Sequence, residues 1–240
     1  MSRAFGYALS AWALLFAMNT ASAANEEAPS VYAGLQGQVL LENDKVRVEK
    51  YELAPGQSTG RHTRFSDQLL VFIKGGVLRS AAGRSTLWRD GRVAWESADK
   101  GSDGGSTNVG TTPIEMIWVR LKQATGTAAP TSGAAPDYHL AYPNIPGEDL
   151  LENDRLVVQR FVVKPGQWEG VHAHRPNMLY IHVKGGQWGE RTYKQPEHSS
   201  GPLSADGSVG WMRTVDIGEG HESRNEGTEP IDLIWVTLKD

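Results

Sequence analysis

The 240-residue sequence contains no cysteine, and this absence removes several classes of protein. Disulfides and thiolate metal sites cannot form, and lipid attachment through an N-terminal cysteine is excluded. An excess of charge of one sign is also missing, because 24 Lys and Arg residues stand against 28 Asp and Glu residues. Without a basic block, we expect neither nucleic acid nor an anionic membrane surface as a partner. Because the chain has no cysteine thiols, any redox chemistry must depend on a bound metal or cofactor.

The one long apolar run lies at the N-terminus. Residues 4–18 follow Arg3 as a run of about 15 apolar positions, short of the roughly 20 that a membrane-spanning helix needs. Ala21-Ser22-Ala23 then has the small-x-small pattern that signal peptidase requires. The sequence therefore predicts a signal peptide over residues 1–23, a periplasmic or secreted protein, and no membrane attachment after cleavage. An uncleaved membrane anchor is the alternative.

The rest of the chain contains the same unit twice. Three segments recur 110 residues downstream and two recur 117 residues downstream, so the second copy carries seven extra residues between its two halves. The matched pairs are 40–44 with 150–154, 55–57 with 165–167, 74–76 with 184–186, 110–114 with 227–231, and 117–119 with 234–236. These matches predict a first repeat over 24–122, a linker rich in Ala, Thr, Gly and Pro over 123–147, and a second repeat over 148–240.

Each repeat has the pattern of an all-β structure. Apolar residues alternate along short segments such as 46–51 and 157–162, and Gly or Pro turns recur every 8 to 12 residues or so. No helical stripe of any length follows the N-terminal run. Many short antiparallel strands in about 100 residues predict a sandwich or a closed barrel.

Two segments of the second repeat resemble the motifs of the cupin superfamily. Residues 166–185 fit the pattern G-x5-H-x-H-x3-E-x6-G with His172 and His174 at the histidine positions, apart from the glutamate. His221 and Asn225 fit the end of the downstream motif, H-x3-N, although the proline of that motif is missing. The resemblance extends from about residue 36 to the C-terminus. It implies an all-β bicupin, two cupin-type jelly-roll β-barrels in tandem, whose metal lies inside a barrel near one mouth.

The spacing of the histidines agrees with this resemblance. His172 and His174 are two positions apart, so on a strand they face the same side with Cα atoms about 6.5 to 7 Å apart. Two imidazoles at that spacing can converge on one metal ion, and barrel closure can place His221 from another strand alongside. We expect a divalent transition metal (Fe, Mn, Ni, Cu or Zn) at these three residues. A polar pocket without metal is the alternative.

The sequence departs from the family pattern at Met178, where cupins usually have a glutamate. A thioether suits soft ions such as Cu(I) better than Fe(II), Mn(II) or Zn(II), so we expect water to complete a three-histidine shell. The resemblance links such shells to cupin dioxygenases that oxidise thiols or cleave diketones and gentisate. A neutral ligand set leaves the full charge on the ion, which favours an anionic or chelating substrate.

Further pocket residues follow from strand parity. Counting by twos from Met178 places Tyr180 and His182 on the same inward face. His182 lies too far along the strand to share the metal, and a hydrogen-bonded core histidine is its favoured role. Arg213 flanks the approach to the downstream motif, and Asn225 fills that motif's asparagine position, so both are also predicted to be pocket residues.

The first repeat lacks the same histidine set. His62 aligns with His172, but Arg64 and Gln68 align with His174 and Met178, and Gly104 aligns with His221. One histidine beside an always-charged arginine cannot hold a transition metal, so this repeat is predicted to have a degenerate site. Arg64 is expected either to form an ion pair or to bind a carboxylate.

Two functions remain open from the sequence alone. One is a metal-dependent, dioxygenase-like enzyme acting on a small anionic or chelating molecule. The other is a non-catalytic periplasmic module that binds or senses a small ligand in the same pocket. Pairing of the two barrels within one chain allows a monomer, and a homo-oligomer is equally compatible.

Overall fold

The computed structural model describes residues 32, 34–63, 65–98, 102–122 and 137–239. The predicted signal peptide, Arg64 and residues 123–136 of the predicted linker lie outside the described residues. The described part is built from β-strands with a single-turn 3-10 helix, η2 (Ile217–Glu219). Within it, no helix has the length and apolarity to cross a membrane.

The first repeat forms one large antiparallel sheet and two small ones. The large sheet has the strand order β1-β2-β10-β4-β7, and the small sheets are β6-β5-β9 and β3-β8. The last strand, β10, therefore lies between β2 and β4 at the centre of its sheet. The strands are β1 (Gln38–Glu42), β2 (Val46–Leu53), β3 (His62–Thr63), β4 (Gln68–Lys74), β5 (Gly76–Ser80), β6 (Ser85–Trp88), β7 (Val93–Glu96), β8 (Ser102–Asp103), β9 (Ser106–Asn108) and β10 (Ile114–Leu121).

The second repeat follows the same plan. Its large sheet has the order β11-β12-β18-β13-β16, and a small sheet has the order β15-β14-β17. The predicted all-β fold of two tandem jelly-roll barrels is confirmed. The strands are β11 (Glu148–Glu152), β12 (Leu156–Val163), β13 (Met178–Lys184), β14 (Gln187–Thr192), β15 (Gln195–Leu203), β16 (Val209–Met212), β17 (Glu222–Asn225) and β18 (Ile231–Leu238).

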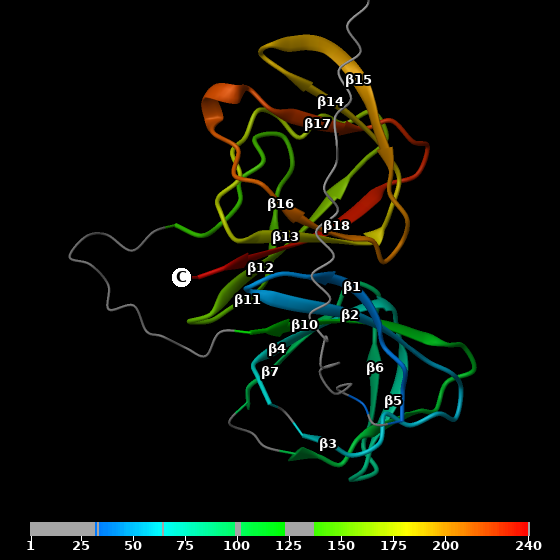
Figure 1. Cartoon of the computed structure of the whole chain (residues 1–240). Coiled ribbons are helices and arrows are strands. Elements are labelled where there is room, and N and C mark those ends of the chain that lie inside the picture. The colour runs from blue at the N-terminus through cyan, green and yellow to red at the C-terminus, as the bar shows by residue number, and fades with distance from the viewer. Residues whose placement is uncertain (1–31, 33, 64, 99–101, 123–136, 240) are drawn as a thin grey trace, which may run out of the picture.

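The two large sheets pack face to face, and the layer between them is one continuous apolar core (Figure 1). Period-two alternation supplies it, because every second residue of a strand faces the other repeat. Val48 in β2, Leu179 and Ile181 in β13 and Ile234 in β18 are fully buried in this layer. We call this layer the interbarrel core. An ion pair between Arg155 and Asp67, with 2.6 Å between Nη1 and Oδ2, joins the repeats beside it.

The opposite faces of the same strands line the interior of each barrel. The first barrel's interior is packed with aromatic and aliphatic side chains, among them Tyr51, Phe72 and Trp118. The second interior contains Phe161 and Trp235. In β13, Leu179 and Ile181 face the interbarrel core, whereas the residues next to them face the interior of the second barrel.

The core of the second barrel includes residues that precede its first strand. Leu140, Tyr142 and Ile145 belong to the predicted linker, yet all three are buried in the core of the second barrel. Their counterparts Tyr32 and Leu35 are buried in the first barrel in the same way. The Ala- and Pro-rich composition around them concealed a segment of the predicted linker that packs into the core of the second barrel.

Because the interbarrel core belongs to both repeats, we expect the barrels to unfold together. Substitution Ile181→Ala should lower the free energy of unfolding by about 2 to 5 kcal/mol and leave a single transition, since it removes packing that both sheets use. Urea unfolding followed by tryptophan fluorescence measures this. Val162→Ala, at a position 43% exposed, is the control and should change stability by less than about 0.5 kcal/mol. Two separated transitions in either protein would show that the repeats fold independently.

Candidate metal centre

The three histidines of the second repeat are brought together by backbone pairing between distant segments. His174 and Val215 form an isolated antiparallel bridge, each backbone N–H donating to the other residue's carbonyl at 2.9 Å. The His172 N–H donates to the His221 carbonyl at 3.2 Å. His221 itself follows Gly220, whose left-handed conformation (φ 62°) ends η2 and directs the chain into β17. The histidines therefore lie on bridged loops and not on one regular strand.

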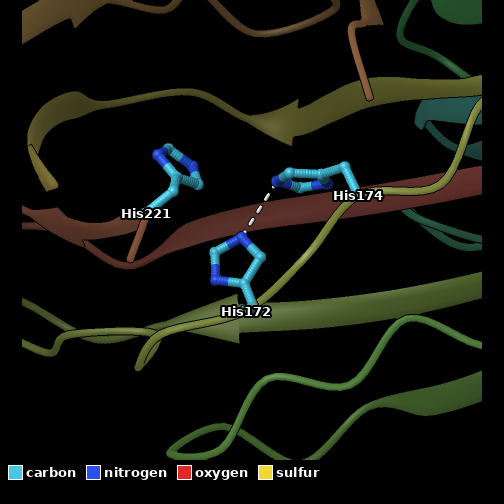
Figure 2. Close-up of side chains that lie close together, drawn as sticks. All are labelled: His172, His174 and His221. Atoms are coloured by element: carbon cyan, nitrogen blue, oxygen red, sulfur yellow. Dashed lines mark hydrogen bonds between the residues drawn. The ribbon is translucent and has the colours of Figure 1, made fainter. Parts of the chain in front are cut away.

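The imidazole rings converge on one point inside the barrel (Figure 2). Ring centroids are 4.6 Å apart for His172 and His174, 5.1 Å for His172 and His221, and 5.6 Å for His174 and His221. One nitrogen from each ring can be chosen so that all three lie within 4.8 Å of one another. Nitrogens that share one transition-metal ion at about 2.0 to 2.1 Å lie at most about 4.2 Å apart, so a small rotation of the rings would bring all three within reach of a single ion.

Burial keeps these rings neutral, as metal ligands must be. Loss of solvent lowers the pKa of His172 to about 4 and that of His174 to about 3, and it also lowers the pKa of His221. His172 Nδ1 lies 2.8 Å from the Gly170 carbonyl, which can only accept, so Nδ1 carries the hydrogen and Nε2 presents a lone pair. That Nε2 atom lies 2.9 Å from His174 Nε2.

A second feature of the cluster is an unpartnered nitrogen. His174 Nδ1 is buried and has no hydrogen-bond partner within the described part of the chain. A buried polar atom without a partner is costly in a native structure unless function requires it. Taken together, the donor set and this orphaned atom fit a divalent transition metal bound by three imidazoles.

His174 and His221 open onto a cavity of about 500 Å³ in the second barrel, a volume that includes its solvent-open part. Its wall is largely aromatic, and it also carries two carboxyl groups. The lining residues are Tyr142, Glu169, His174, Tyr180, His182, Trp188, Glu190, Pro202, Ser204, Met212, His221, Ser223, Leu233 and Trp235. This shape and chemistry are typical of small-molecule sites.

Tyr180 and His182 both line this cavity, as the alternation along β13 predicts. The indole N–H of Trp188 donates to His182 Nε2 at 3.1 Å, so His182 must carry its hydrogen on Nδ1. That Nδ1–H donates to the Ser208 hydroxyl at 3.0 Å. Burial lowers the pKa of His182 to about 4. His182 is thus a neutral wall residue with both nitrogens engaged.

The other three predicted pocket residues lie elsewhere. Met178 is buried in the second barrel's core, and the Asn225 amide donates to the carbonyls of Val163 and Glu229, which fixes the turn before β18. Arg213 is exposed and donates to the carboxylate of Glu219. Of the described residues that line the cavity, none is one of these three.

Glu169 and Tyr142 are cavity residues that the sequence analysis missed. The Trp235 indole N–H donates to the Tyr142 hydroxyl at 2.8 Å, and Tyr142 in turn hydrogen-bonds Glu169. Tyr142 also packs edge-on against His172, with ring centroids 4.5 Å apart. One signal was available, because Tyr142 has a counterpart in Tyr32 at the same 110-residue offset as the recognised repeats.

In the first barrel, other residue types occupy the positions that line the cavity of the second barrel. Leu70 and Phe72 occupy the places of Tyr180 and His182, and Phe72 stacks on Trp88 with centroids 4.5 Å apart. Thr59 stands where the second repeat has Glu169. In the described part of this barrel, His62 is the one counterpart of the three histidines, and the carboxyl and the polar residues of β13 have apolar or uncharged replacements.

Comparison with known proteins identifies the fold. No protein-family model and no curated protein sequence matches the chain. Among solved structures, the protein YhaK from Escherichia coli has a TM-score of 0.52 at 16% identity, covering 84% of this chain and 88% of that one. AerE from Microcystis aeruginosa has a TM-score of 0.51 at 11% identity, covering 85% of this chain and 97% of that one.

A third structure is a salicylate 1,2-dioxygenase variant from Pseudoaminobacter salicylatoxidans in complex with gentisate. Its TM-score is 0.54 at 10% identity, and the match covers 85% of this chain and 74% of that one. The chain has the cupin fold. Two barrels of this fold follow one another in the chain, and the histidine cluster lies in the C-terminal barrel. At these identities, the similarity concerns the fold alone.

The lowered histidine pKa values predict acid sensitivity of the metal-free protein. In the unfolded chain the imidazoles of His172 and His174 titrate near pH 6.5, whereas in the fold they resist protonation until about pH 4 or below. Their contribution to stability is therefore complete above pH 6.5 and lost as the pH falls toward 4. Unfolding free energies measured at pH 7 and pH 5 should show this loss, and His174→Asn should reduce it. An equal loss in both proteins would contradict the assignment.

Proposed function

We propose that the chain is an exported, metal-dependent protein whose C-terminal barrel binds one divalent transition-metal ion at His172, His174 and His221. We further propose that it acts as a dioxygenase-like enzyme on a small anionic or chelating substrate. The observation that carries the proposal is the convergence of three neutral imidazoles, two of which, His174 and His221, line one cavity. The sequence motifs of the second repeat support the same set of ligands.

The chain's own residues account for most of what such a site needs. His172, His174 and His221 would hold the ion, which would supply Lewis acidity and, if redox-active, electrons for O2 chemistry. Tyr142, Tyr180, Trp188 and Trp235 exclude water from the wall and offer ring faces for an apolar part of a substrate. Gly170 holds His172 in the tautomer that presents Nε2.

The preference for an anionic or chelating substrate rests on charge. The imidazoles add no negative charge, and Met178 replaces the carboxylate that most cupins have. The gentisate complex of a dioxygenase with the same fold supports a small ligand of this kind.

The second candidate is a non-catalytic module that binds or senses a small ligand. One observation favours it: both nitrogens of His182 are occupied, so the histidine on the wall outside the triad is not free to act as a base. Such a module would bind metal and ligand without turnover, and this difference separates the two candidates.

Export is part of the same proposal and is supported by the N-terminal sequence pattern. We expect the mature chain to begin at Ala24 and to fractionate with the periplasm or the medium. Mass spectrometry of the protein purified from each fraction tests this. A full-length chain retained in the membrane fraction would instead indicate an anchor.

Metal analysis of the purified mature protein tests the site. We expect about one transition-metal ion per chain and, for His172→Ala, His174→Ala and His221→Ala, affinities lowered by about 100-fold or more. His62→Ala is the matched control, because His62 occupies the position of His172 in the first barrel and should not affect binding. Unchanged occupancy in the triad variants would refute the three-histidine site.

Oxygen consumption by the metal-loaded protein tests catalysis. With Fe(II) bound, a panel of thiols, diketones and phenolic acids should include at least one substrate that drives uptake, and this uptake should vanish in His174→Ala. Ligand binding at the metal without oxygen consumption or any change in the ligand would favour the binding module.

A further inference from the structure

Glu169 is a buried carboxyl on the wall of the metal cavity. Glu169 is 2% exposed and lines the same cavity as His174 and His221. The backbone places it beside the metal ligands, because its N–H donates to the Ser223 carbonyl at 2.9 Å, on the ladder where His172 bonds His221. Backbone pairing therefore places Glu169 and the histidines in adjacent parts of the same barrel.

Every group that bonds this carboxyl is a neutral donor. The Tyr142 hydroxyl and the hydroxyl and backbone N–H of Ser223 all hydrogen-bond it. Tyr142 is free to donate its hydrogen because its oxygen already accepts from the Trp235 indole. No Lys or Arg within the described residues forms an ion pair with Glu169, so its negative charge has hydrogen-bond support and no counter-ion.

The other titratable groups around the cavity do not supply that counter-ion. Glu190 on β14 is a second carboxylate and repels charge on Glu169. Burial keeps His174, His182 and His221 neutral, and Tyr180 on β13 has its pKa raised by burial. Loss of solvent outweighs the three donors and raises the pKa of Glu169 to about 8. The cavity thus carries a neutral acid where no cation is present.

Carboxyl and histidines also occur together in only one repeat. The first barrel has Thr59 in place of Glu169 and Gly104 in place of His221. In the second barrel, the position where cupins usually have their glutamate is occupied by Met178, whose thioether carries no charge. The only buried carboxyl among the described lining residues is therefore the one at position 169.

We propose that Glu169 is the counter-charge of the metal centre and gives up its proton when a divalent cation binds the three histidines. This inference rests on the proposed metal site. The carboxyl O–H bond breaks, the proton passes to solvent, and the carboxylate that remains keeps its three donors. A neutral imidazole set leaves the cation's charge uncompensated, and a carboxylate in the same low-dielectric cavity lowers that cost. Glu169 is a positioning and charge-balancing residue and is not placed among the ligands.

Zinc affinity as a function of pH tests the proposal. Between pH 6 and pH 8, the dissociation constant of the wild type should fall about tenfold for each unit of pH, because one proton leaves Glu169 per ion bound. Glu169→Gln keeps the shape of the side chain but has no proton to release. Its affinity should be weaker than that of the wild type at pH 8 and should change by less than about threefold over the range.

Two controls make the outcomes distinct. Glu190→Gln removes the exposed carboxylate of the same cavity and should keep the tenfold dependence, and circular dichroism checks that each variant is folded. Calorimetry in two buffers of different ionisation enthalpy should count about one proton released by the wild type at pH 7 and none by Glu169→Gln. Equal pH dependence in the two proteins overturns the role of Glu169 alone. Failure of the wild type to bind zinc overturns the proposed metal site and this inference with it.

Discussion

Three imidazoles whose nitrogens lie within 4.8 Å of one another inside a barrel are most stable when all three rings are uncharged. Loss of solvation penalises a charged ring and lowers all three pKa values, and repulsion from neighbouring imidazoles adds to this effect for His172 and His174. The neutral cluster is therefore suited to bind a metal cation, which the imidazole nitrogens coordinate through their lone pairs without being protonated. The remaining polar features of the second barrel can be understood as consequences of this constraint.

The wall around the histidines keeps water away from them and holds their orientation. Tyr142 packs on His172 and connects it, through one hydroxyl, to both Trp235 and Glu169. A similar arrangement of Tyr32, His62 and Trp118 remains in the first barrel, with ring contacts of 4.8 and 5.1 Å from Tyr32. The aromatic scaffold thus persists in both repeats, whereas the ligands and the carboxyl persist in one. We infer that the first barrel contributes mainly the sheet that covers the second.

Much of this architecture could be predicted from local sequence patterns. The repeat offset and period-two alternation are sufficient for two β-barrels, and the inward positions of Tyr180 and His182 follow from parity along β13. The spacing of His172 and His174 predicts two rings on one side, although the chain there forms a bridge and not a strand. Each of these features is determined by residues close together in the sequence, so a local pattern is enough to predict it.

The features that were missed depend on long-range pairing or on side-chain choice. Glu169 reaches the cavity because residue 169 pairs with residue 223, a register that no local pattern specifies. Tyr142 lies in a segment whose composition resembles a linker. Arg213 has a partner in Glu219, six residues away, and Asn225 serves a turn, so their side chains are committed to local structure. A sequence motif marks such positions without revealing which bonds the side chain makes.

The central claim is that one ion is held by three imidazole nitrogens from the second barrel. X-ray absorption spectroscopy of the protein loaded with one equivalent of zinc or cobalt tests it most directly. We expect three imidazole nitrogens at about 2.0 to 2.1 Å, with light oxygen scatterers completing the shell. A spectrum with a sulfur scatterer at about 2.3 Å, or with fewer than three imidazoles, would contradict it.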